Sequence, residues 1–97
     1  MTNAAREAAD AALQGISHAL AEGAHPAYED VADAVRRLVV LRDILIVETR
    51  QGGAPDRLDR ANAILSQAHG AEYPLVGVHR RRLEQAADAL RGLRGDL

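Results

Sequence analysis

Cysteine, lysine, phenylalanine and tryptophan are all missing from this chain. The absence of cysteine excludes disulfides, thiolate zinc sites, iron–sulfur clusters and cysteine nucleophiles. Because Tyr28 and Tyr73 are the only aromatic residues, the core is expected to be aliphatic, with alanine where elements approach closely. Apolar runs stay below the roughly 18 residues that a membrane span needs, and the first residues lack a signal-peptide pattern. We therefore expect a cytoplasmic protein with no membrane partner.

Size limits how much surface the chain can bury. Its 97 residues and 10.4 kDa fit a single helical domain over residues 1–97. A chain of this length buries only about 60–65% of its unfolded surface. Although 47% of the residues are hydrophobic, much of that share is alanine. Self-association is a natural way for such a chain to bury more apolar surface.

Charge is distributed unevenly along the chain. All 12 basic residues are arginine, a bias typical of GC-rich genomes that we do not interpret as functional. Residues 1–34 hold one arginine against six acidic residues, a net charge of −5, whereas residues 79–97 carry +2. The two ends are expected to attract each other, within one chain or between chains. The overall net charge of −2 argues against a dedicated nucleic-acid binder.

Hydrophobic periodicity predicts four helices over residues 3–22, 27–50 and 55–69, with a last one whose regular part begins near Val78. Glycine and proline mark the three breaks between them. This pattern predicts an all-α fold, a small antiparallel four-helix bundle with the second helix central.

The second predicted helix contains the strongest apolar segment, residues 38–47. At 100° per residue its charges gather into a seam of Arg36, Asp43 and Arg50 and a thinner strip of Arg37 and Glu48. Apolar residues occupy nearly all the remaining circumference, so the helix is expected to be central or shared between subunits. We therefore predict at least a dimer, with three apolar residues of this helix at the interface: Val40, Ile44 and Val47.

Arg42 lies by projection among apolar residues of the same helix: Val31, Val35, Leu38 and Ile46. A guanidinium in that position is expected to pair with a carboxylate, which we place in the acidic first helix or the loop after it. The alternative is that Arg42 faces a pocket and binds an anion.

Three further places are candidate interaction sites. Tyr73 begins a short apolar stretch that either docks a partner or closes the end of the bundle. His79 occupies a seam position of the last helix, as an interface or core residue or, alternatively, as a general base or pH switch. Arg80, Arg81 and Arg82 point in three directions, a solvated face on which Glu84 pairs with Arg80. Alternatively, they contact phosphate or nucleic acid when an oligomer gathers several such runs.

Histidine and glutamate recur at intervals of four, three and four residues: His18, Glu22, His25 and Glu29. Gly23 and Pro26 interrupt the helix that would align them, so we predict no metal site. The sequence also offers no catalytic constellation and no cofactor motif.

These observations predict a non-enzymatic helical protein-interaction module, either a homo-oligomer or an adaptor for another protein. One alternative is a nucleic-acid-associated accessory factor of a phage or mobile element, acting through the arginines around Arg80. A third is a small helical enzyme that binds an anion through Arg42.

Overall fold

A computed structural model describes residues 3–21, 26–70 and 79–97. These residues form four helices and no strand: α1 (Ala4–Leu20), α2 (Tyr28–Arg50), α3 (Pro55–Gly70) and α4 (His79–Gly95). The predicted all-α class is confirmed, and each helix lies at its predicted segment. None of the described helices combines the length and apolar character needed to cross a bilayer.

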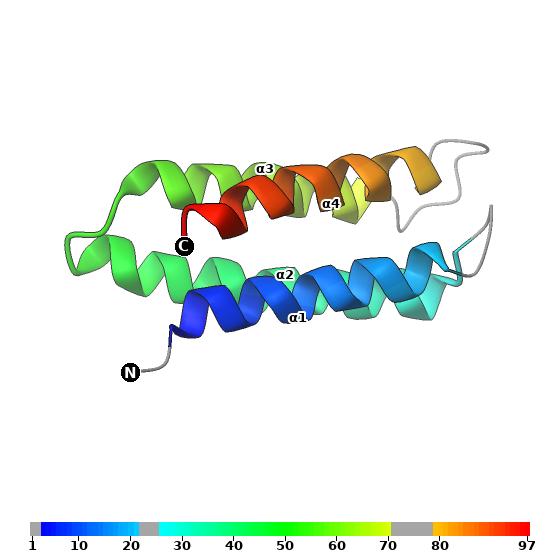
Figure 1. Ribbon diagram of the computed structural model, residues 1–97, viewed down its shortest axis with the longest axis horizontal. Helices are drawn as coiled ribbons and strands as arrows, with labels where there is room; N and C mark the ends of the chain where they lie inside the picture. The colour runs from blue at the N-terminus through cyan, green and yellow to red at the C-terminus, as the bar shows by residue number, and fades with distance from the viewer. Residues whose placement is uncertain (1–2, 22–25, 71–78) are drawn as a thin grey trace.

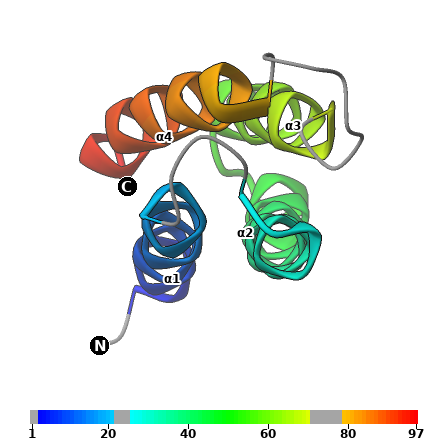
Figure 2. The ribbon, with the colours of Figure 1, turned by 90° about the vertical axis from the view of Figure 1, so that its right-hand side faces the viewer.

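The four helices pack side by side along an axis of 41 Å, and the other two dimensions are 22 and 19 Å. Consecutive helices run in opposite directions along this axis (Figure 1). Seen from one end, α1 and α2 form one layer, and α3 and α4 form the other (Figure 2). Each helix contacts two others, and the described Cα atoms of α2 and α4 stay more than 8 Å apart. Within one chain, α2 therefore occupies a corner, and a central position would require a second molecule.

Local capping explains two of the helix ends. The Asn3 side chain accepts a hydrogen bond of 3.0 Å from the Arg6 amide and so caps the start of α1. After α2, Gly52 adopts a φ of +100°, and the Gly53 amide donates to the Glu48 carbonyl at 2.8 Å. A Cβ at Gly53 would lie 2.8 Å from that same oxygen. Both glycines are thus required by the turn, one for its dihedral angle and one for its close approach.

The core is aliphatic and rich in alanine, as predicted. Its largest fully buried side chains are leucines of α2 and α4 together with Ile16 and Val31. Helix α1 contributes one large fully buried residue, Ile16, beside buried alanines. This slim face brings α1 close to α2, because a Cβ at Gly15 would lie 3.1 Å from Arg37 Cδ and 3.3 Å from Ala34 Cα.

Two ion pairs join residues that are distant in the sequence. Asp10 of α1 accepts a hydrogen bond from Arg94 of α4, so the predicted attraction between the acidic start and the basic end occurs within the chain. Arg60 of α3 pairs with Asp96, just after α4. The hydrogen bond from each arginine holds the pKa of its carboxyl partner, Asp10 or Asp96, below the ordinary value of 3.8.

The Asp10–Arg94 pair predicts a pH dependence of stability. Because the folded chain lowers the pKa of Asp10, the pair stabilises the fold above pH 3.8, and this contribution is lost as the pH falls through the folded-state pKa. We expect Asp10→Asn to lower the free energy of unfolding at neutral pH, with a difference from the native chain that narrows below pH 3.8. Urea unfolding over a pH series, followed by circular dichroism, measures the loss at neutral pH and its decrease at low pH.

Asp88→Asn is the matched control. Asp88 pairs with Arg91 inside α4. Asp88→Asn therefore changes the net charge by the same amount as Asp10→Asn, but it breaks no contact between two helices. Equal destabilisation by the two variants would contradict a linking role for Asp10.

Candidate functional site

Helix α2 carries every large hydrophobic side chain that is well exposed in the described residues: Tyr28, Val40 and Val47. Val40 and Val47 are 53% and 51% exposed and lie seven residues apart on one face. Ile44 lies between them, half-buried against the core. We call Val40, Ile44 and Val47 the valine strip. The structure thus places these three predicted interface residues on one outward face of α2.

Charged residues border the valine strip on both sides. Arg36, Asp43 and Arg50 are exposed along one edge, whereas Arg37 and Glu48 are half-buried along the other. Both groupings were predicted from the 100° projection. An apolar centre with a polar border is the arrangement found in many protein interfaces.

Arg37 has a structural role that sequence reasoning missed. Its Nη1 donates a hydrogen bond of 2.9 Å to the Ala11 carbonyl in the middle of α1, and its Nε lies 2.9 Å from Asp33 Oδ2. Gly15 leaves room for this side chain to cross between the helices. The sequence signals of this close approach were the alanines of the first helix and the single glycine among them.

The predicted partner of Arg42 is wrong. Its carboxylate comes from the adjacent Asp43, whose Oδ1 accepts bonds of 3.2 Å from Nε and 3.0 Å from Nη2 of Arg42. The Arg42 side chain is 34% exposed, and that of Asp43 is 60% exposed. The aliphatic stem lets the guanidinium reach solvent, so no carboxylate from α1 is needed.

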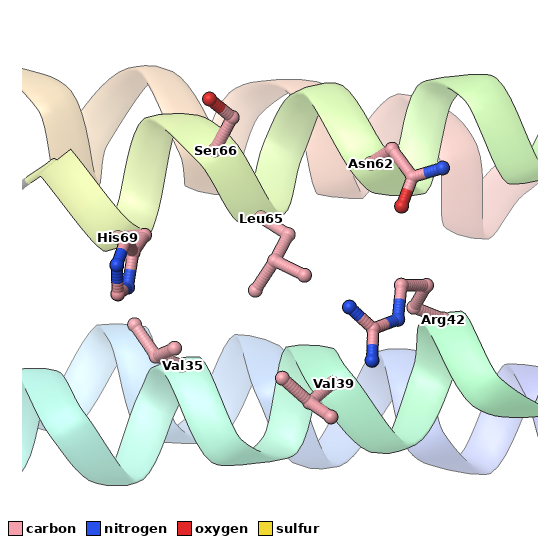
Figure 3. Close-up of a pocket in the computed structure, with 7 residues that line it drawn as sticks. All are labelled: Val35, Val39, Arg42, Asn62, Leu65, Ser66 and His69. Atoms are coloured by element: carbon pink, nitrogen blue, oxygen red, sulfur yellow. The ribbon is translucent and has the colours of Figure 1, made fainter.

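Arg42 also lies in a groove of about 380 Å³ between α2 and α3. The groove is lined by Val35, Val39, Arg42, Asn62, Leu65, Ser66 and His69. In Figure 3, Arg42 and His69 lie at opposite ends, with Val39 and Leu65 between them. The concave space that the anion-binding alternative requires is therefore present. Arg42 also has the carboxylate partner that the structural alternative requires, which is Asp43.

The polar residues that α3 contributes to this groove were not predicted as a group. Asn62, Ser66 and His69 follow one another at intervals of four and three, which places them on one side of a helix. That spacing was visible in the sequence. The rotation of α3 that turns this side toward α2 depends on how the helices pack. It could not be read from the sequence.

The arginine run divides between different environments. Arg80 Nη1 donates a hydrogen bond of 2.8 Å to the Leu20 carbonyl at the end of α1, and its Nε lies 3.0 Å from Glu84 Oε1. The predicted Arg80–Glu84 pair is therefore present. Arg81 is exposed and Arg82 half-buried, so the three side chains do not share one surface.

Several candidates fall wholly or partly outside the described residues. Tyr73 lies outside them, and only the backbone of His79 is described, as the first residue of α4. Of the spaced histidines, His18 has its Nε2 3.6 Å from Asp30 Oδ1, whereas His25 lies outside the described residues. Within the described part of the chain, no three histidine, aspartate or glutamate residues are grouped so that they could hold a metal ion.

No protein-family model, curated protein or solved structure matches the chain. The valine strip and the α2–α3 groove are the two features of the described residues that point to a function.

Two arginine substitutions on α2 are predicted to differ in their effect on stability. Arg42→Met should change the free energy of unfolding by less than about 0.5 kcal/mol, because its partner is an exposed carboxylate. Arg37→Met should lower it by about 1 kcal/mol, because a half-buried hydrogen bond between two helices is lost. Urea unfolding of both variants measures the two values. A larger loss for Arg42→Met than for Arg37→Met would contradict these roles.

Proposed function

We propose that this chain is a non-enzymatic protein-interaction module that acts as a homodimer through the outward face of α2. The observation that carries the proposal is the valine strip, with two valines more than half exposed on one face. Apolar surface removed from water contributes about 25 cal/mol per Å². Self-association would bury this strip without rearranging the aliphatic core behind it.

Charge favours a second copy of the chain as the partner. The exposed edge of α2 reads positive, negative, positive at intervals of seven residues: Arg36, Asp43 and Arg50. When two copies of α2 pair in opposite directions about a twofold axis, like edges meet. A register that sets Asp43 opposite Arg50 of the other copy forms this contact twice and places Val47 beside the axis. Such edge contacts select register and partner more than they add affinity.

A dimer of this kind would make α2 central. Within the chain α2 contacts α1 and α3, and the second copy would cover its outward face. The predicted bundle with the second helix at its centre would thus be formed by two chains.

The nucleic-acid alternative has less support. Arg80 donates to the Leu20 carbonyl and pairs with Glu84, which leaves Arg81 as the exposed member of the run. A single run of this kind supplies few phosphate contacts, and the chain carries a net charge of −2.

The dimer is tested by mass in solution. Light scattering at tens of micromolar should give twice the chain mass of 10.4 kDa. Val47→Glu should give a monomer, because a buried unpaired carboxylate costs several kcal/mol. Its helical content should persist, because Val47 is half exposed within the chain. A monomeric native chain would exclude the homodimer and leave another protein as the partner of the strip.

Charge reversal provides a matched control for partner choice. Asp43→Arg alone should weaken the dimer, because the edge then carries three like charges. Adding Arg36→Asp and Arg50→Asp restores alternation with inverted sign, and this triple variant should pair with itself again. Equal dimerisation of the single variant, the triple variant and the native chain would contradict the proposed register.

A further inference from the structure

The groove between α2 and α3 combines an apolar floor with a cation at one end. Val35 and Val39 come from α2 and Leu65 from α3, and each of them is buried or half-buried. Figure 3 shows the Arg42 guanidinium extending over the α2 side of the groove, near Val39. The volume of about 380 Å³ lies at the lower end of the range of small-molecule sites.

Arg42 retains hydrogen-bonding capacity for a ligand. Its Nε and Nη2 donate to the single oxygen Oδ1 of Asp43. Among the described residues, none accepts a hydrogen bond from Nη1 of Arg42. A guanidinium presents five donors in a planar fork, so Nη1 and the second hydrogen of Nη2 can together hold a carboxylate.

We propose that this groove binds a small aliphatic carboxylate, with its carboxylate on Arg42 and its hydrocarbon chain on Val35, Val39 and Leu65. Because Arg42 already pairs with Asp43 at 3.0 Å, a ligand on the same guanidinium meets repulsion from that carboxylate. This repulsion is weaker for a singly charged carboxylate than for a doubly charged phosphate. The apolar floor requires a ligand with a hydrocarbon chain, which acetate and other very small anions lack.

The groove and the valine strip share no residue. The lining residues of the groove on α2 are Val35, Val39 and Arg42, none of which belongs to the valine strip. Binding of a ligand and self-association can therefore each fail without the other, and light scattering during the titration reports on the second.

The test is a titration of the ¹⁵N-labelled chain with sodium hexanoate, followed by amide chemical shifts. Shifts should concentrate on residues that line the groove, with saturation that yields a dissociation constant. Acetate lacks the hydrocarbon chain and 1-hexanol lacks the charge, so each should bind at least about tenfold more weakly than hexanoate. Absence of groove shifts with hexanoate, or equal binding of hexanoate and 1-hexanol, overturns the proposal.

Substitutions on α2 separate the charge of Arg42 from the shape of the groove. Arg42→Met keeps an apolar side chain and should weaken hexanoate binding at least about tenfold, because the carboxylate loses its charged hydrogen bonds. Arg36→Met removes an arginine from the exposed edge and should leave binding unchanged. Unchanged binding in Arg42→Met overturns the proposal.

Asp43→Asn is a gain-of-function variant at an exposed position, where the fold should tolerate the change. It removes the competing carboxylate from Arg42 and should tighten hexanoate binding about threefold or more, within the range of exposed ion-pair energies. Weaker hexanoate binding in Asp43→Asn than in the native chain would overturn the role given to Arg42.

Discussion

The close approach of α1 to α2 at Gly15 is the constraint on which the arrangement of α2 depends. The helices are near enough that a Cβ at Gly15 would press on the backbone of Ala34 and on the stem of Arg37. Only a slim, alanine-rich α1 allows this approach, and such a helix covers little of its neighbour. Leu38, Leu41 and Leu45 turn into the core, while the valines on the outward face of α2 stay uncovered. The exposed strip lies on the side of α2 that faces away from the core.

A helix that is apolar around most of its circumference has three different uses here. Its inward residues fill the core, its outward residues form the valine strip, and Val35 and Val39 line the groove beside α3. Hydropathy values do not distinguish these three groups of residues. Whether each residue is buried depends on the direction in which its side chain points. Both functional proposals therefore depend on which side chains of α2 are exposed, and the packing of the neighbouring helices determines that.

Features that depend on nearby residues were predictable from the sequence. Glycine and proline fixed the turn around Gly52 and the start of α3 at Pro55, and the 100° projection placed Arg36 and Asp43 on the exposed edge. Features that depend on the rotation of one helix against another could not be predicted from the sequence. The partner of Arg42 was mistaken because the projection locates Cα and Cβ atoms but not the end of a long side chain. The residues that α3 contributes to the groove were missed because their side of α3 is set against α2 only by the packing of the two helices.

Asp43 connects the two proposed activities of α2. Its Oδ1 accepts hydrogen bonds from Nε and Nη2 of Arg42, while the proposed dimer sets the same carboxylate opposite Arg50 of the second copy. A carboxylate drawn toward the second copy neutralises Arg42 less, which strengthens the attraction of the groove for an anion. Because binding linkage is reciprocal, an anion on Arg42 would then favour the dimer by the same factor. In the proposed dimer, a single exposed aspartate would couple the outward face of α2 to the groove beside it.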